Sequence, residues 1–262
     1  MTTKQMPQDA APAGSSERMQ LPPLLVGHRA LVTGAARGIG KAVADAFAET
    51  GADVVRLDIE ASEDVRRCDV SDEASVERAF KEAVADGPIT DVVHVAAIAA
   101  ISTLSEMSVT EFRRVLDVNV TGTFLIAREA SRHLRRGGNL VLFASQYGLK
   151  GWPMWGAYCA SKAGVLRLAD TLVGELSPLG IRVNTISPGT VDTEMVAATT
   201  AEVARQSGTD PRAVRAQYEA AIPIGRYARP DEMASVVVAL CSGLCSYVSG
   251  ANIVVDGGEL SR

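Results

Sequence analysis

The chain has 262 residues, of which 47% are hydrophobic and 22% are charged, and its formal net charge is −5. This composition is typical of a globular protein, and the length is sufficient for one large domain with a full core. An acidic chain offers no basic surface for nucleic acid or an anionic membrane, so we expect a small-molecule partner instead. No apolar run reaches the roughly 18 residues of a spanning helix, and no signal peptide is evident, which predicts a cytoplasmic protein.

Cysteine and histidine spacing excludes two further classes. The four cysteines show neither CxxC spacing nor the density of a disulfide framework, so we expect reduced and mostly buried thiols. The three histidines are scattered and have no carboxylates at ligand spacing, so we predict no metal site.

The pattern along the chain predicts an α/β fold. Residues 1–23 are polar, lack an apolar period and are predicted to form a disordered extension, whereas residues 24–262 are expected to form one domain. From Arg29 onward, apolar runs of strand length alternate with helical stretches, as in parallel sheets with crossover helices. The expected strands lie near residues 30–34, 53–58, 65–70, 91–97, 139–145, 181–187 and 252–257, and the clearest helices near 41–50, 75–86 and 155–176. Val, Ile and Leu dominate the strands, which predicts a doubly wound, Rossmann-type three-layer sandwich with a parallel sheet of about seven strands.

A glycine-rich run, TGAARGIG, follows the first strand and leads into a helix expected to begin at Lys41. Glycines at 34, 38 and 40 would let the chain turn sharply and present backbone N–H groups and the helix dipole to a pyrophosphate. The alternative is a glycine-rich turn that serves only strand-to-helix packing.

Asp58 ends the second strand, where a carboxylate can accept hydrogen bonds from the adenosine ribose. The same charge repels a 2′-phosphate, so we expect NAD rather than NADP. Two guanidinium groups, of Arg37 and Arg56, are close enough in sequence to favour NADP instead, but Arg56 is expected to be a solvated surface charge. The alternative for Asp58 is an ordinary exposed acid at a strand end.

Tyr158 and Lys162 stand four residues apart, so on a helix both side chains share one face. A nearby ammonium favours phenolate and would lower the pKa of the phenol, making Tyr158 a general acid or base. Ser145 ends a preceding strand at the carboxyl edge of the sheet, where open α/β folds bind ligands, and its hydroxyl can hold a substrate oxygen. A bare YxxxK pair also arises on solvated helices, and a serine at a strand end also bonds to backbone.

Together these residues resemble the short-chain dehydrogenases/reductases, in their single-domain branch, over about residues 29–258. The glycine run resembles the family's TGxxxGxG loop, and Asn119 in DVNVTG matches its catalytic asparagine, although a helix-interior Asn can simply be satisfied by a neighbouring carbonyl. The resemblance implies a catalytic tetrad of Asn119, Ser145, Tyr158 and Lys162. It implies cofactor contacts from Gly34, Arg37, Gly38, Ile39, Gly40, Asp58, Asp69, Val70, Ala96, Tyr158, Lys162, Pro188, Gly189, Val191 and Thr193.

One segment departs from the family. Where NNAG usually follows the fourth strand, this chain has VAAI at 95–98, so the bracing contacts of both amides must be replaced or lost. The run HVAA resembles the extended, sugar-nucleotide branch, but the spacing of the first loop and the lack of a sizeable C-terminal substrate domain do not fit that branch.

The resemblance implies hydride transfer between nicotinamide and a secondary alcohol or ketone, with Tyr158 moving the proton and Asn119 anchoring a water beside Lys162. Residues 190–229 interrupt the strand–helix rhythm and are expected to form a substrate lid. The expected substrate contacts are Ser145, Gln146, Trp152, Tyr158 and Met195, with Met154, Trp155, Tyr218 and Ile222 nearby. The aromatic members serve equally well as packing or a subunit contact. This mixture suits a modest cyclic or polyol-like alcohol.

Two other functions stay open on the sequence. A non-catalytic dinucleotide sensor would keep the glycine loop but would not need the tetrad, and a sugar-nucleotide epimerase or dehydratase would retain NAD without net turnover. The C-terminal segment from Arg229 to Gly258 resembles the family's tetramer-forming segment, so we expect a homotetramer, with a dimer as the alternative.

Overall fold

A computed structural model describes residues 21–261, so the first twenty residues of the predicted extension lie outside the described part. Leu21 and Leu24 already pack against the core. Within residues 21–261, no helix combines the length and the apolar character needed to cross a membrane.

A seven-stranded, fully parallel sheet forms the centre of the molecule, in the order β3-β2-β1-β4-β5-β6-β7. The strands are β1 (Arg29–Thr33), β2 (Asp53–Asp58), β3 (Arg66–Arg67), β4 (Ile89–His94), β5 (Leu134–Phe143), β6 (Arg182–Pro188) and β7 (Asn252–Val255). The strand order reverses between β1 and β4, and in doubly wound folds such a switch point opens a ligand crevice at the carboxyl ends of the strands. The predicted fold class is therefore confirmed.

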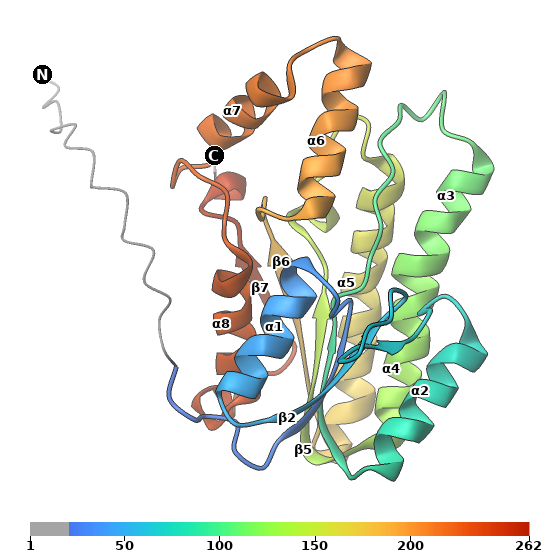
Figure 1. Cartoon of the computed structure of the whole chain (residues 1–262), viewed down its shortest axis with the longest axis vertical. Helices are drawn as coiled ribbons and strands as arrows, with labels where there is room; N and C mark the ends of the chain where they lie inside the picture. The colour runs from blue at the N-terminus through green and yellow to red at the C-terminus, as the bar shows by residue number, and fades with distance from the viewer. Residues whose placement is uncertain (1–20, 262) are drawn as a thin grey trace, which may run out of the picture.

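Helices cover both faces of the sheet (Figure 1). The helices are α1 (Gly38–Glu49), α2 (Glu73–Ala85), α3 (Val109–Leu116), α4 (Gly122–His133), α5 (Gly156–Leu176), α6 (Glu194–Ser207), α7 (Pro211–Ala221) and α8 (Pro230–Cys241). The short turns are η1 (Asp117–Thr121), η2 (Gln146–Gly148), η3 (Ser177–Leu179), η4 (Gly243–Cys245) and η5 (Glu259–Ser261). Helices α1 and α8 pack together on one face, α2, α4 and α5 lie on the other, and α6 and α7 stand beyond the sheet at the end where β6 finishes.

Strand residues alternate between two hydrophobic clusters, one on each face. Leu31, Val92 and Leu140 face α2, α4 and α5, whereas Val32 and Val93 face α1 and α8. Burial on both faces explains the near-continuous apolar runs in the sequence.

Several expected boundaries were wrong: β4 ends at His94 rather than near residue 97, and β5 begins at Leu134 rather than near residue 139. The strand expected near residues 65–70 shortens to the two residues of β3, because Cys68 and Val70 turn inward to the core instead of extending the sheet edge. Helix α1 begins at Gly38 rather than at Lys41, so the glycine run itself forms the first helical turn.

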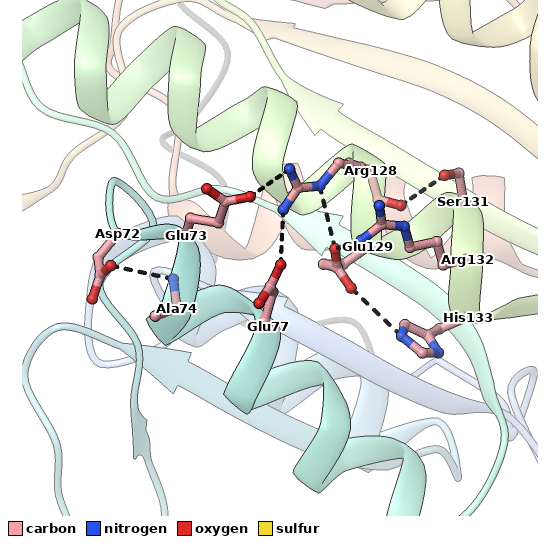
Figure 2. Close-up of polar contacts among 9 residues, drawn as sticks. All are labelled: Asp72, Glu73, Ala74, Glu77, Arg128, Glu129, Ser131, Arg132 and His133. Atoms are coloured by element: carbon pink, nitrogen blue, oxygen red, sulfur yellow. Dashed lines mark hydrogen bonds and ion pairs between the residues drawn. The ribbon is translucent and has the colours of Figure 1, made fainter.

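An ion-pair network ties α2 to α4 on one outer face (Figure 2). Arg128 of α4 reaches Glu73 at 2.7 Å and Glu77 at 3.3 Å, both on α2. Its neighbour Glu129 is nearly fully buried and also pairs with Arg132 at 2.7 Å. Since α4 follows directly on η1, this network braces the helix next to the turn that carries Asn119.

Candidate active site

The glycine loop between β1 and α1 is packed at backbone distance. A Cβ on Gly40 would lie 2.0 Å from the carbonyl oxygen of Gly34, and a Cβ on Gly34, whose φ is +69°, would lie 2.9 Å from the amide nitrogen of Ala96. Neither position therefore accepts a side chain. Arg37 stands at the N-cap of α1 without a side-chain cap, so the first N–H groups of the helix stay available to an anion. This cradle fits the pyrophosphate of a dinucleotide.

Asp58 closes the loop at the end of β2. Its two carboxylate oxygens each accept a backbone hydrogen bond of 3.0 Å, from the N–H of Ala36 and from that of Glu60. Arg37 pairs with Glu60 at 2.9 Å. Arg56 is not the solvated charge that we expected, because its guanidinium is mostly buried and pairs with Asp45 of α1 at 2.8 Å. Of the two guanidinium groups, only that of Arg37 lies exposed beside Asp58.

The unusual segment after β4 is braced by a threonine hydroxyl. The N–H groups of Val95 and Ala96 donate to Oγ1 of Thr33 at 3.1 and 3.3 Å. These bonds occupy both lone pairs, so the hydroxyl proton goes to Nδ1 of His94, 2.7 Å away, and Nε2 of the imidazole carries the ring proton. Burial, reinforced by the charge of Lys162, lowers the pKa of His94 to about 3.

Asn119 lies in η1, a five-residue π-helix between α3 and α4; such bulges occur frequently at functional sites. Its Oδ1 accepts the N–H of Ile98 and its Nδ2 donates to the carbonyl of the same residue, each at 2.8 Å. Nδ2 also reaches Oγ of Ser161 on α5 at 3.0 Å. Asn119 therefore ties the loop after β4 to the helix of Tyr158. The sequence left open a purely structural role for Asn119, in which a neighbouring carbonyl accepts a hydrogen bond from its side chain. The carbonyl of Ile98 is that partner.

Ser145 and Lys162 meet at the carboxyl end of β5. Oγ of Ser145 accepts the N–H of Tyr147 at 3.2 Å and so caps η2. Lys162 is 3% exposed and its Nζ donates to the carbonyl of Phe143 at 2.7 Å. The same Nζ lies 5.7 Å from the centroid of the Tyr158 ring. The structure thus brings the three side chains together as their spacing predicted.

The prediction that the pKa of Tyr158 is lowered was wrong. Burial raises the pKa of Tyr158 to about 12, although the hydroxyl of Ser145 opposes this increase. Burial also lowers the pKa of Lys162 to about 7. Removing both side chains from water therefore outweighs the effect of their proximity.

A backbone contact fixes the spacing between η2 and α5. A Cβ on Gly148 would lie 2.7 Å from the carbonyl carbon of Lys162. This contact sets how far the Ser145 segment stands from the helix of Tyr158 and Lys162.

The segment after β6 connects the site to α6. Gly189 donates its N–H to Val255 at 2.9 Å, and a Cβ there would lie 2.7 Å from Cα of Asp256. Val191 is buried. Thr193 caps α6 through the N–H of Val196 at 3.3 Å and would contact a Cβ on Gly38 at 3.4 Å. Thr193, one of the expected cofactor contacts, therefore lies against the glycine loop.

Asp69 and Val70, two of the expected cofactor contacts, lie between β3 and α2. Asp69 accepts hydrogen bonds from the backbone and hydroxyl of Ser71, at 2.9 and 2.6 Å. Val70 is buried, and a Cβ on Gly122 would lie 3.0 Å from its side chain, so Val70 also packs on the start of α4.

An aromatic wall stands beside Tyr158. The ring of Tyr147 lies 4.7 Å from Trp152 and 4.6 Å from Trp155, centroid to centroid, and 6.0 Å from Tyr158. Sequence reasoning missed Tyr147, although it directly follows Ser145 and Gln146. Met154 in the same segment has a φ of +70°, a conformation that non-glycine residues rarely adopt and that clusters at functional sites.

Two expected substrate contacts differ in their surroundings. Gln146 is fully buried and donates from Nε2 to Glu259 at 3.0 Å, a partner that the sequence did not suggest. Met195 lies on α6 and is 39% exposed. A cavity of about 90 Å³ near Ile222 lies between α8 and the chain that follows α7, and none of the four tetrad residues lines it.

Comparisons with known proteins agree with this geometry. Residues 34–259 match the family model described as Enoyl-(Acyl carrier protein) reductase. The D-threitol dehydrogenase of Mycolicibacterium smegmatis is 36% identical over 252 residues, covering 89% of this chain and 93% of that protein. The FabG 3-oxoacyl-[acyl-carrier-protein] reductase of Aquifex aeolicus is 34% identical, covering 89% of this chain and 98% of that protein.

A solved structure extends the likeness to three dimensions. The ligand-free aldohexose dehydrogenase of Thermoplasma acidophilum superposes with a TM-score of 0.84 at 29% identity, covering 91% of this chain and 96% of that one. The chain belongs to the short-chain dehydrogenase/reductase family. It is an oxidoreductase of that family, which acts on alcohols or ketones with a nicotinamide cofactor.

Proposed function

We propose that this chain is an NAD-dependent dehydrogenase/reductase of neutral secondary alcohols and the corresponding ketones. The observation that carries the proposal is the convergence of Ser145, Tyr158 and Lys162 at the carboxyl end of β5, beside a glycine cradle that accepts no side chain. A protein that only sensed dinucleotides would have no need for this buried acid–base group.

The cradle and Asp58 would hold the cofactor. The uncapped start of α1 would bind the pyrophosphate, and Asp58 would bind the adenosine ribose. The negative charge of Asp58 disfavours a 2′-phosphate, and Arg37 is already paired with Glu60, which supports NAD over NADP. When bound, the nicotinamide supplies the hydride acceptor or donor.

The residues of the chain would handle the proton and the substrate oxygen. Ser145 donates a hydrogen bond to that oxygen, and Tyr158 removes the hydroxyl proton in oxidation or returns it in reduction. Lys162 lies in a buried position, where its positive charge stabilises phenolate strongly when it is protonated. Asn119 anchors the loop after β4 and, in this proposal, a water beside Lys162.

The wall of Tyr147, Trp152 and Trp155 supports a compact cyclic or polyol-like substrate. The names of the D-threitol and aldohexose dehydrogenases point in the same direction. We further propose that residues 190–229, which include α6 and α7, act as the lid of one domain, and that the enzyme is a cytoplasmic homotetramer.

A single assay tests the proposal. Absorbance of reduced nicotinamide, followed over a panel of secondary alcohols and ketones with NAD and with NADP, should show net turnover and a preference for NAD. Tyr158→Phe should reduce kcat by roughly 10²-fold or more, the scale of a lost general acid–base group, while NADH fluorescence titration shows nearly unchanged binding.

Tyr247→Phe is the matched control, because that phenol is fully exposed and should be dispensable. A fully active Tyr158→Phe enzyme would contradict the assigned role. Tightly retained NAD without net turnover would instead indicate an epimerase or dehydratase.

A further inference from the structure

A buried polar pair stands beside the proposed site. Gln146 is fully buried, and its Nε2 donates to Oε2 of Glu259 at 3.0 Å. Oε1 of Gln146 has no hydrogen-bond partner among residues 21–261. Reversing the amide would place its oxygen against the carboxylate, so the unpartnered atom is an acceptor. A buried acceptor without a donor costs free energy, which suggests that a ligand supplies the donor.

The C-terminal turn holds Glu259 in place. Asp256 accepts the N–H groups of Gly258 at 2.9 Å and of Leu260 at 2.8 Å, which clamps both sides of Glu259. Gly257 and Gly258 have φ values of +64° and +87°, so the turn has a conformation that suits glycine. Glu259 is therefore presented to Gln146 by a defined turn.

The pair lies next to the residues that would hold the reacting oxygen. Gln146 directly follows Ser145, and Tyr147 contacts the ring of Tyr158. Burial, followed by the proximity of Tyr218 and Glu259, raises the pKa of Tyr147. Tyr147 is thus close both to the ring of Tyr158 and to the carboxylate of Glu259.

Glu259 has no basic partner within the described residues: every ion pair there involves other carboxylates. Its Oε1 forms no hydrogen bond within the same part of the chain. Gln146 and Glu259 therefore each have one acceptor oxygen without a donor. We propose that Gln146 and Glu259 bind a second hydroxyl of the substrate, on the carbon next to the reacting one. This inference rests on the proposed dehydrogenase activity and concerns its substrate specificity. The enzyme should prefer vicinal diols and should reject substrates with a carboxylate on the carbon next to the reacting one.

Matched cyclohexane substrates test the inference. The probes are cyclohexanol, cyclohexane-1,2-diol, 2-hydroxycyclohexanecarboxylate and 2-aminocyclohexanol, each assayed as kcat/KM with NAD. The wild-type enzyme should prefer the diol to cyclohexanol. Glu259→Gln should lower the diol-to-cyclohexanol ratio by about 10- to 100-fold, the range of a lost charge-assisted hydrogen bond. The same variant should gain activity on the carboxylate probe, because the like charge has been removed.

Two controls separate specificity from folding. The midpoint of thermal unfolding of Glu259→Gln should match that of wild type, as expected when the fold is undisturbed, so a change in the diol-to-cyclohexanol ratio then reports specificity. Glu175→Gln removes the same charge at an exposed position near the far end of α5 and should leave all four probes unchanged.

Three other outcomes would contradict either this inference or the proposed function. If wild type turns over cyclohexanol as well as the diol, or if the ratio survives Glu259→Gln, the inference is wrong while the dehydrogenase activity stands. A strong preference for 2-aminocyclohexanol would show that Glu259 binds a cation instead of a hydroxyl. If no alcohol or ketone produces an absorbance change, the proposed function itself fails.

Discussion

Lys162 is a charged side chain at a position with almost no access to water, and within residues 21–261 its Nζ donates only to the carbonyl of Phe143. Burial lowers its pKa to about 7, whereas an ordinary lysine in an unfolded chain titrates near pH 10.4. Between these values the unfolded state binds more protons, so the contribution of Lys162 to stability increases as the pH rises from 7 to 10. Below pH 7 the full cost of burying the ammonium is present.

We therefore predict that Lys162→Met is inactive but more stable than wild type at pH 6, by about 2 kcal/mol. This figure is the ionisation cost of several kcal/mol less the hydrogen bond that is lost. The advantage should shrink towards zero or reverse by pH 10. Chemical unfolding at both pH values measures it, with Lys81→Met, an exposed lysine of α2, as the control that should show no such trend. A pH-independent difference would argue against the lowered pKa of Lys162.

Asp58 has a structural role as well as the proposed selective one. Replacing it removes two backbone hydrogen bonds, and Arg37 remains engaged by Glu60. We predict that Asp58→Ser raises the NADP-to-NAD ratio of kcat/KM by about tenfold or more, and that adding Glu60→Gln raises it further by releasing the guanidinium. Glu63→Gln, an exposed acid on the same loop, should leave the ratio unchanged. An unaltered ratio in the double variant would remove the case for Asp58 as the selector.

At the residue scale, spacing together with the family resemblance singled out Ser145, Tyr158 and Lys162, because a strand end and a helical turn bring those positions together. The shifted pKa of Tyr158 was not predictable, since it depends on burial by segments distant in sequence. Glu259 was missed because 113 residues separate it from Gln146 and no motif connects the two.

At the element scale, α6 and α7 are attached to the site by few contacts. Arg215 of α7 forms two hydrogen bonds to Asp192, at 3.2 and 3.0 Å, and its guanidinium carbon lies 4.6 Å from the centroid of the Tyr227 ring. Gln206 of α6 donates to the carbonyl of Ile101 at 2.8 Å. Gly208, at the end of α6, has a φ of +67° and connects the two helices.

We predict that Arg215→Ala loosens α7 without unfolding the protein. The midpoint of global unfolding should correspond to a loss of about 1 kcal/mol or less, as for other surface ion pairs, whereas hydrogen exchange in α7 should become faster and KM should rise. Arg205→Ala removes a pair confined to α6, with Glu202, and is the matched control. Equal exchange rates in the two variants would contradict a role for Arg215 in holding α7.

The elements were predicted unevenly. Strands β2 and β6 were located almost residue for residue, because they are apolar runs between polar turns. The start of α1 was misplaced because Gly38 and Gly40 are poor helix formers in isolation, and tight packing against Gly34 and Thr193 decides their conformation. The π-helix around Asn119 has no signal in a hydrophobic period that tracks ordinary helices.

At the scale of the whole molecule, the parallel sheet followed from the alternation of apolar runs and helices. Its strand order did not, because periodicity says which faces are buried but not which strands are neighbours. The oligomeric state is likewise not evident from the structure of a single chain. Exposed apolar side chains in the C-terminal segment, Leu244, Tyr247 and Val254, fit the proposed tetramer.

We predict a particle of four 27.5-kDa chains by light scattering. Val254→Asp places a charge on β7, the edge strand of the sheet, and should yield a smaller species. Val26→Asp, also at an exposed valine but outside that segment, should leave the mass unchanged. A monomer in the wild type would refute the tetramer directly.

The contact between Gly148 and the backbone of Lys162 also limits how such an enzyme can be redesigned. Because backbone contacts backbone there, a larger residue at 148 would push the Ser145 segment and the helix of Tyr158 and Lys162 apart, however well neighbouring side chains were repacked. Libraries that seek new substrates should therefore leave this contact unchanged and vary α6, α7 and η5, which belong to the proposed substrate-binding surface.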